Sequence, residues 1–292
     1  MNNPLISICI PAYNAAPYIV ETLSCFKNQS YNHLEIIVQD DCSTDATYVL
    51  AEEEAKKDKR IKAFKNSRNL GIGKNWNEAY SKANGDLIVI ANADDIYHPD
   101  MLINALSIFN QYPQLDSVSF KFLLFNENLN TISELLLHKQ LNVGLQTELF
   151  RTCFFYNPFH IVFSIFKKSS LDKILVDNQE LFLKTQICDA ELFFRIGKNS
   201  FRHYYSDYIA GKYRKHQTNN SYIPNGESYS WLYDVFPLYR NYLKENYLQE
   251  TKALLKSKIV HQFKFSLRNF RRLDIKQIST LLKELNLLSK KT

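Results

Sequence analysis

The chain has 292 residues, of which 45% are hydrophobic and 23% are charged, and its formal net charge is +6 at pH 7. A chain of this length and composition buries a large core, which excludes a disordered or low-complexity protein. No run approaches the ~20 apolar residues that a membrane-spanning helix requires. The five cysteines form no CxxC pair, so we expect reduced structural thiols and neither a disulfide framework nor a zinc site.

Short apolar runs alternate with amphipathic stretches through the first hundred residues. Ser43, Thr44 and Asp45 are typical of a helix start, and Asn84-Gly85 is typical of a helix end. The alternation predicts an α/β fold, with a mostly parallel sheet and helices on both of its faces. In chain order, the predicted elements are a strand at 7–14 broken by Pro11, a helix at 17–29, a strand at 34–40, a helix at 48–57, a strand at 61–64, a helix at 74–83 and a strand at 87–91.

An aromatic ring and two carboxylates follow predicted strands. Tyr13, Asp41 and Asp95 each lie at or just past the carboxyl end of a strand. Ligands of open α/β sheets bind beyond these ends, so the three side chains are expected to converge on one crevice, as in a nucleotide site. Each residue taken singly has a structural alternative. Tyr13 is then a half-buried aromatic residue of a loop, Asp41 a helix cap and Asp95 part of a turn.

Two adjacent carboxylates, Asp94 and Asp95, end the hydrophobic run LIVIANADD. A chain that leaves a buried strand has no structural need for two like charges. Mg²⁺ and Mn²⁺ take oxygen ligands and need only one or two protein carboxylates when substrate phosphates supply the rest. The pair therefore predicts a divalent metal site, with a solvated acidic turn as the alternative.

Four ordered motifs, PAYN, DDCSTD, NLGIGKNWNEAYSKANGD and ANADD, carry a family resemblance. Together they resemble the family-2 nucleotide-sugar glycosyltransferases, whose catalytic domain has the GT-A fold, a mostly parallel sheet flanked by helices. The resemblance is dense over residues 4–100 and continues in patches to about residue 221. It implies a GT-A catalytic domain at 1–220, with a nucleotide-binding half at 1–100 and an acceptor-binding half at 101–220, followed by an aromatic and basic α-helical extension at 221–292.

The resemblance implies roles for individual residues around the donor. Tyr13 would stack on the nucleotide base, and Asp41 would accept a hydrogen bond from a ring N–H, as a carboxylate does in selecting uracil. Asp94 matches the position that contacts ribose, and Asp95 matches the metal ligand. Asn92 stands where the common Asp-x-Asp form has its first acid, and it is a candidate contact to the donor sugar.

The other nucleotide-binding candidates come from the PAYN motif and from a predicted loop-to-helix junction. Pro11 and Asn14 belong to PAYN, and Lys74 lies one helical turn before Asn77. A cation and free backbone N–H groups at a helix start suit a diphosphate. A solvated lysine on a helix face is the alternative for Lys74.

A carboxylate at a second predicted helix start is our candidate for the general base. Asp189 opens the helix in QICDAELFFRIG, and DAELFFRI is similar to the acceptor-side segment in which the family places its catalytic base. A carboxylate within reach of an acceptor hydroxyl removes its proton during transfer. The alternative is a simple helix N-cap. Glu191, two residues further on, is the second choice.

Two histidines are candidates for contacts at the same site. His160 aligns with a position near the acceptor or donor sugar in relatives, and a buried structural histidine is the alternative. His216 lies in KYRKHQTNNS, which resembles the family pattern Tyr-Arg-x-His followed by Asn and Ser. In some relatives a histidine from this region completes the metal shell, and imidazole suits Mn²⁺. In others the segment is a mobile lid over the donor.

The C-terminal stretch is strongly basic. Residues 251–292 hold eleven Lys or Arg against two acidic residues, a net charge of +9, with apolar positions at helical spacing. These helices are expected either to pack on the catalytic domain or to dock on an anionic membrane surface. The aromatic stretch 222–247 suits stacking on acceptor sugars or contact with a second subunit of a homo-oligomer.

These observations predict an inverting glycosyltransferase that moves a sugar from a nucleotide-diphosphate donor, such as a UDP-sugar, to a hydroxyl of a surface glycan or lipid-linked acceptor. We expect Mn²⁺ or Mg²⁺ as cofactor and no nucleic acid partner. The N-terminus starts on the first strand without a signal segment, so we expect a cytoplasmic enzyme, peripheral on the inner face of the membrane. The alternatives are a non-catalytic nucleic-acid or membrane-binding protein, and a sugar nucleotidylyltransferase. A nucleotidylyltransferase would have a glycine-rich phosphate loop near its N-terminus, whereas the segment SICIPAYN contains no glycine.

Overall fold

The computed structural model describes residues 3–134, 141–155, 158–176, 179–183, 188–216 and 283. Apart from Lys283, these residues belong to one compact unit, Met1–Tyr222. The predicted C-terminal extension, including its basic and aromatic stretches, lies outside the described residues except for Lys283.

Strands and helices alternate through the first ninety residues, which confirms the predicted α/β pattern. The central strands are buried along their whole length, as expected for parallel strands that are covered on both faces. The elements of this half are β1 (Ile6–Ala12), α1 (Ile19–Lys27), β2 (Leu34–Asp40), α2 (Thr47–Lys57), β3 (Ile61–Lys65), α3 (Ile72–Ser81) and β4 (Leu87–Ile90).

The second half adds further strands to the same sheet and packs helices against it. Its elements are β5 (Ile96–Tyr97), α4 (Met101–Gln111), β6 (Ser117–Asn126), β7 (Thr131–Glu134), β8 (Gly144–Leu145), α5 (Leu149–Phe155), β9 (Ser164–Lys167), α6 (Lys168–Leu171), α7 (Cys188–Lys198) and β10 (His203–Lys215), with short 3₁₀ helices at Ile161–Phe163 and Asp172–Ile174.

The sheet has the strand order β3-β2-β1-β4-β9-β6-β10-β5, and β7 and β8 pair with β6 and β10. Strands β1 to β4 are mutually parallel, whereas β9 runs antiparallel to both β4 and β6. Because β10 is parallel to β6, both strands run in the same direction as β4. The carboxyl ends of β1, β2, β4, β6 and β10 therefore lie at the same edge.

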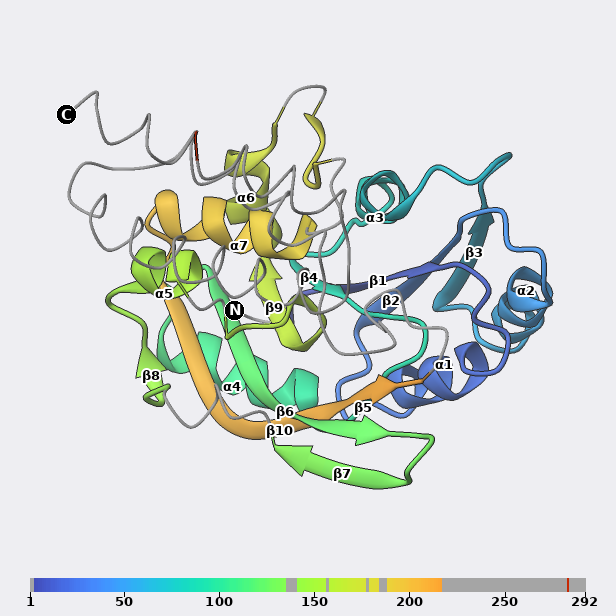
Figure 1. Ribbon diagram of the computed structural model, residues 1–292, viewed down its shortest axis with the longest axis horizontal. Coiled ribbons are helices and arrows are strands. Elements are labelled where there is room, and N and C mark those ends of the chain that lie inside the picture. The colour runs from blue at the N-terminus through green and yellow to red at the C-terminus, as the bar shows by residue number, and fades with distance from the viewer. Residues whose placement is uncertain are drawn as a thin grey trace. The chain divides into compact units, whose positions relative to one another are not determined.

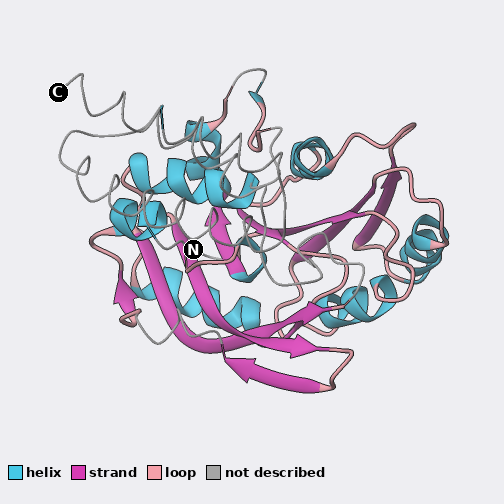
Figure 2. Cartoon of the chain, in the orientation of Figure 1, coloured by secondary structure: helices cyan, strands magenta, loops and turns pink. Residues whose placement is uncertain are grey.

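Helices cover both faces of the sheet (Figure 1). Helices α1 and α2 pack against each other, and α3 packs against β1 and β2. Strand β10 curves along the sheet beside β6, and the β6–β7 hairpin extends beyond it (Figure 2). This layered arrangement is the one predicted from the alternation of elements.

The first strand continues through Pro11, where the sequence predicted a break. The carbonyl oxygen of Cys9 accepts a bond from the N–H of Ala91, so Cys9 faces β4. Residues two apart on a strand face the same neighbour, and pairing with β4 ends at Cys9–Ile90. Pro11 therefore meets no partner on that side, and its missing N–H removes no ladder bond.

A buried carboxylate, Glu35, ties together the amino ends of three strands. Its Oε1 accepts bonds from Ser7 Oγ at 2.7 Å and from the Asn84 N–H at 2.8 Å, and Lys62 Nζ lies 2.8 Å from Oε2. The N–H of Gly85 donates to Ser7 Oγ at 2.8 Å. Burial alone would raise the pKa of Glu35, but the bonds from Lys62, Asn84 and Ser7 outweigh it and the pKa is lowered.

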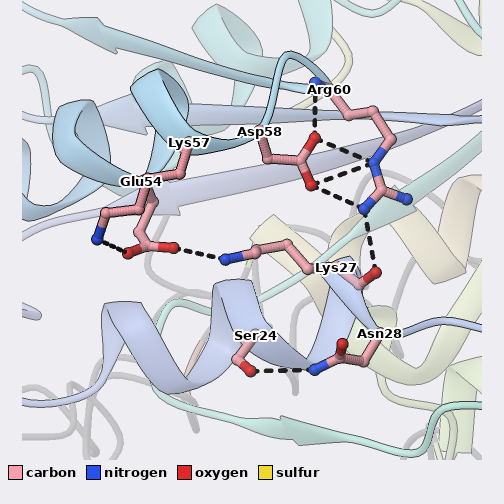
Figure 3. A network of polar contacts seen from close by, with 7 residues as sticks. All are labelled: Ser24, Lys27, Asn28, Glu54, Lys57, Asp58 and Arg60. Atoms are coloured by element: carbon pink, nitrogen blue, oxygen red, sulfur yellow. Dashed lines mark hydrogen bonds and ion pairs between the residues drawn. The ribbon is translucent and has the colours of Figure 1, made fainter.

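A second charge network joins α1, α2 and the start of β3 (Figure 3). Glu54 pairs with Lys27 at 2.8 Å and with Lys57 at 2.7 Å. Arg60 grips Asp58 with two nitrogens and donates to the carbonyl oxygen of Lys27 at 3.0 Å. Every carboxylate of this network is matched by a cation, so the network stabilises the contact between the two helices.

Candidate active site at the carboxyl edge of the sheet

The strand order reverses between β1 and β4, because β2 and β3 lie on one side of β1 and β4 lies on the other. Such a switch point is where open α/β sheets bind ligands, beyond the carboxyl ends of the strands. Tyr13 follows β1, and the segment from Asn92 to Asp95 follows β4. The structure thus places the predicted stacking ring and the predicted metal motif on either side of this point.

The residues of the PAYN motif divide into buried and exposed members. Pro11 is buried within β1, and the ring of Tyr13 is 50% exposed at its end. Asn14 has a positive φ of 50° and connects two loops, because its N–H donates to Ser43 Oγ and its Oδ1 accepts from the N–H of Thr44, both at 2.9 Å. Tyr13 is therefore open for stacking, and Asn14 fixes the loop beside it.

Asp41 is buried at the end of β2 and holds the loop that leads into α3. Its carboxylate accepts bonds from Asn66 Nδ2 and the Leu70 N–H at 2.8 Å and from the Gly71 N–H at 2.9 Å. Gly71 has a φ of 83°, which glycine adopts without strain. A carboxylate offers about four acceptor positions, so one remains for the predicted bond from a base, which stays a prediction.

The two predicted α3 residues lie in different surroundings. Lys74 is exposed in the first turn of the helix. Asn77 accepts bonds from the N–H groups of Leu181 and Phe182 at 2.9 and 2.8 Å and donates to the carbonyl oxygen of Phe182 at 2.8 Å. Asn77 thus fastens residues 181–182 to α3, and its contact with a nucleotide stays a prediction.

Asp95 is 1% exposed and accepts one hydrogen bond on each carboxylate oxygen. The N–H of Arg214 donates to Oδ1 at 2.8 Å, and Asn92 Nδ2 donates to Oδ2 at 3.0 Å. Burial, followed by the neighbouring charge of Asp94, raises the pKa of Asp95 well above its ordinary value. Asn92 therefore supplies a donor where the common family motif would add a third negative charge.

Strand β10 brings His216 to the same acid pair. Its Nε2 lies 2.9 Å from Asp94 Oδ2, and its ring packs on Tyr18 with centroids 4.5 Å apart. Carboxylate oxygens and an imidazole are suitable ligands for Mn²⁺, and each Asp95 oxygen keeps an acceptor position. Within the described part of the chain, no three His, Cys, Asp or Glu side chains are grouped to hold a metal. Asp95 and His216 would leave the remaining positions around such a cation to water or phosphate.

The two carboxylates of α7 differ in exposure. Asp189 is partly exposed in the first turn, one residue inside the helix start. Glu191 is fully buried, and both of its carboxylate oxygens accept hydrogen bonds from Arg195, at 2.6 and 2.7 Å. Arg195 in turn donates to the carbonyl oxygens of Ile174 and Leu181. Glu191 therefore has a structural contact, and Asp189 stays the candidate base.

His160 is packed among aromatic side chains. Its ring packs against Tyr213 and Phe122 with centroids 4.9 and 5.5 Å apart, and its buried Nδ1 has no hydrogen-bond partner among the described residues. Burial lowers the pKa of His160, while the charges of Asp189 and Asp94 oppose that shift.

Arg214 is the site residue that sequence reasoning missed. It lies two positions before His216, and it bonds to Asp94, Asp95 and Glu127. Its place in the KYRKHQTNNS motif was visible in the sequence, although its partners were not.

The order and direction of the strands are those of the GT-A fold. The family model described as glycosyl transferase family 2 matches residues 7–175, more than half of the chain. The chain belongs to this family.

Curated relatives carry the same kind of name. An uncharacterized glycosyltransferase of Haemophilus influenzae is 33% identical over 162 residues, covering 54% of this chain and 50% of the relative. One of Methanocaldococcus jannaschii is 28% identical over 259 residues, covering 81% and 89%. The putative teichuronic acid biosynthesis glycosyltransferase TuaG of Bacillus subtilis is 36% identical over 99 residues, covering 34% and 39%. The chain thus spans about half the length of the first of these relatives.

Solved structures share the fold. TarS of S. aureus, residues 1–349 in complex with UDP-GlcNAc, superposes with a TM-score of 0.69 at 21% identity, covering 96% of this chain and 80% of TarS. The mannosyltransferase PcManGT of Pyrobaculum calidifontis, in complex with GDP-Man and Mn²⁺, gives 0.61 at 18% identity, covering 97% and 86%. These likenesses establish the GT-A fold. No helix in the described ranges is long and apolar enough to cross a membrane.

Proposed function

We propose that the chain transfers one sugar, with inversion, from a UDP-sugar to a hydroxyl of a surface glycan or lipid-linked acceptor. The observation that carries this proposal is the buried Asp95 beside Asp94 at the switch point of the sheet, with His216 adjoining the pair. Two neighbouring carboxylates in a desolvated position are expected where a cation is part of the working site.

Asp95 and His216 would hold Mn²⁺ or Mg²⁺, and Asp94 beside them would contact the ribose of the donor. When bound, the cation acts as a Lewis acid that offsets the charge developing on the departing diphosphate. The neighbouring residues keep the ligands in place, because Asn92 donates to Asp95 and Tyr18 packs on His216.

The donor base would stack on Tyr13, whose ring is half exposed at the end of β1. Asp41 would accept the ring N–H, and the exposed Lys74 at the start of α3 would meet the diphosphate. One remaining acceptor position on Asp41 is sufficient for the single ring N–H of uracil. The TarS complex with UDP-GlcNAc supports the same assignment by analogy.

Asp189 would remove the proton of the acceptor hydroxyl while that oxygen attacks the anomeric carbon. The carboxylate is partly exposed at the start of α7. Attack by the activated hydroxyl displaces the nucleoside diphosphate in one step, which inverts the anomeric configuration. Such proton removal contributes about 10²- to 10⁴-fold to a rate.

The deciding experiment measures thermal stabilisation of the full chain by UDP, GDP and dTDP with and without Mn²⁺. We expect UDP with Mn²⁺ to raise the melting temperature most. Stabilisation by a DNA or RNA oligomer in place of the nucleotides would contradict the proposal and favour the nucleic-acid-binding alternative.

We also place the enzyme in the cytoplasm, peripheral on the inner face of the membrane, because residues 251–292 carry a net charge of +9. Co-sedimentation with vesicles containing anionic lipid, compared with neutral vesicles, tests this location. Equal sedimentation with both would contradict it.

A further inference from the structure

The guanidinium of Arg214 is buried at the end of β10, where the residue is 6% exposed. It lies between two aromatic rings, 5.0 Å from the centroid of Tyr18 and 5.5 Å from that of Phe125. Its Nη1 is 2.9 Å from Glu127 Oε1, and its Nη2 contacts the carboxylate of Glu21. A buried cation is tolerated only with such partners, so its position is narrowly defined.

The same residue binds both members of the acid pair through two different groups. Its Nε donates to the carbonyl oxygen of Asp94 at 2.8 Å, and its backbone N–H donates to Asp95 Oδ1 at 2.8 Å. The first bond fixes the backbone of the pair, and the second orients the carboxylate of Asp95. Movement of the end of β10 would therefore displace the candidate metal ligands directly.

Tyr18 closes the network around this residue. Its hydroxyl donates to Glu127 Oε2 at 2.8 Å. Its ring packs against the His216 ring and makes a cation–π contact with the Arg214 guanidinium. Segments distant in sequence, at the start of α1 and at the ends of β4, β6 and β10, thus meet at one buried guanidinium.

We propose that Arg214 is a positioning residue for Asp94 and for the candidate metal ligand Asp95, an inference that rests on the proposed function of Asp95. Arg214 touches neither metal nor substrate in this role. It holds the main chain of Asp94 and the side chain of Asp95 so that both keep one arrangement before the cation and the donor arrive. Loss of a residue that supports metal ligands typically weakens metal binding by about 10- to 100-fold.

The test measures binding of Mn²⁺ alone, by the electron paramagnetic resonance signal of the free ion, in the full chain and in Arg214→Gln and Arg214→Lys. We expect Arg214→Gln to weaken Mn²⁺ binding by about 10- to 100-fold. Arg214→Lys keeps the charge but lacks the planar fork, so it should restore part of the affinity. In transfer assays, the same variants should shift the Mn²⁺ dependence more than the rate at saturating Mn²⁺.

Arg60→Gln is the matched control, because Arg60 also grips a carboxylate and a carbonyl oxygen, in the network of Figure 3. It should lower the melting temperature and leave Mn²⁺ affinity unchanged. Equal loss of affinity in Arg60→Gln and Arg214→Gln would overturn the proposal, since both would then act through general loosening. Unchanged affinity in folded Arg214→Gln would overturn it as well.

Should Arg214→Gln fail to fold, Tyr18→Phe and Arg214→Lys decide the question. Tyr18→Phe removes only the bond to Glu127, so a several-fold weaker Mn²⁺ affinity is expected, and unchanged affinity in both variants would overturn the proposal. A wild-type chain that binds no Mn²⁺, with or without UDP, would instead overturn the metal assignment of the proposed function. The two failures are therefore distinguishable.

Discussion

The two edges of the sheet each hold a buried carboxylate, and the two have opposite electrostatics. At the amino edge, Glu35 faces Lys62 and receives bonds from Ser7 and Asn84, and its pKa is lowered. At the carboxyl edge, Asp95 is buried beside the like charge of Asp94, and its pKa is raised.

The contrast separates a carboxylate that stabilises the fold from one that serves a ligand. Glu35 is more favourable charged than neutral inside the protein, because a cation and donors surround it. Asp95 has donors but also a like charge, an arrangement that a bound cation would improve. Paired acids with raised pKa values at a ligand-binding edge therefore point to function, whereas buried acids with matched cations point to structure.

The largest expected effect is that of Asp95→Asn at the carboxyl edge. The variant should lose Mn²⁺-dependent UDP binding and lower sugar transfer by about 10³-fold, in the range found for removing a group that stabilises developing charge. Its unfolding free energy should change by no more than about 1 kcal/mol, since the loss of one hydrogen bond is offset by the loss of charge repulsion between Asp94 and Asp95. Calorimetric UDP titrations and thermal unfolding check both parts.

A variant Asp95→Asn with full Mn²⁺-dependent UDP binding would contradict the contrast between the edges. So would a large loss of stability, because Asp95 would then resemble Glu35. Asp100→Asn, at a half-exposed acid just before α4, is the matched control and should change neither quantity.

The next effect concerns Asp189→Asn on α7. UDP binding should be retained, while transfer should fall by about 10²-fold, because the amide cannot take the proton of the acceptor hydroxyl. Single-turnover assays with UDP-sugar and acceptor, alongside UDP titrations, measure the two separately. Full transfer by this variant would remove Asp189 from the mechanism, and Glu191 would not replace it, since both its oxygens are bound to Arg195.

Local patterns were sufficient to predict the sheet edge and its acid pair. The alternation of runs sets strands and helices, and parallel strands bring their ends together, so Tyr13, Asp41 and Asp95 were predictable from short windows of sequence. The strand through Pro11 was not, because that depends on where β4 stops pairing. Local sequence does not contain that information.

The contacts that could not be predicted from the sequence join residues that lie far apart along the chain. Arg214 contacts Glu21, which is 193 residues away, and Glu127, which is 87 residues away. Asn77 bonds to residues 104 and 105 positions further on. The Glu191–Arg195 pair has the i,i+4 spacing that sequence can reveal, but its complete burial follows only from the packing of α7.

A smaller effect is expected at the amino edge from Glu35→Gln. Loss of the charged hydrogen bonds should lower the unfolding free energy by about 2 kcal/mol, with Mn²⁺ and UDP binding unchanged. Lys62→Met should cost less, about 1 kcal/mol or below, because the Lys62 side chain is 48% exposed. Urea unfolding measures the stabilities, and impaired Mn²⁺ binding in Glu35→Gln would show that the two edges are not independent.

The smallest expected effect is the pH dependence of the stability difference between the wild-type chain and Glu35→Gln. Because the folded pKa of Glu35 lies below its ordinary value of 4.5, the native state binds fewer protons than the unfolded state in the window between them. The contribution of Glu35 is therefore fully present above pH 4.5 and is lost as the pH falls through the folded pKa. The stability difference between wild type and Glu35→Gln, measured by urea unfolding from pH 7 to pH 3, should be constant down to about pH 5 and then shrink. A stability difference that grows as the pH falls would mean that the pKa of Glu35 is raised, as the pKa of Asp95 is. The electrostatic contrast between the two edges would then disappear.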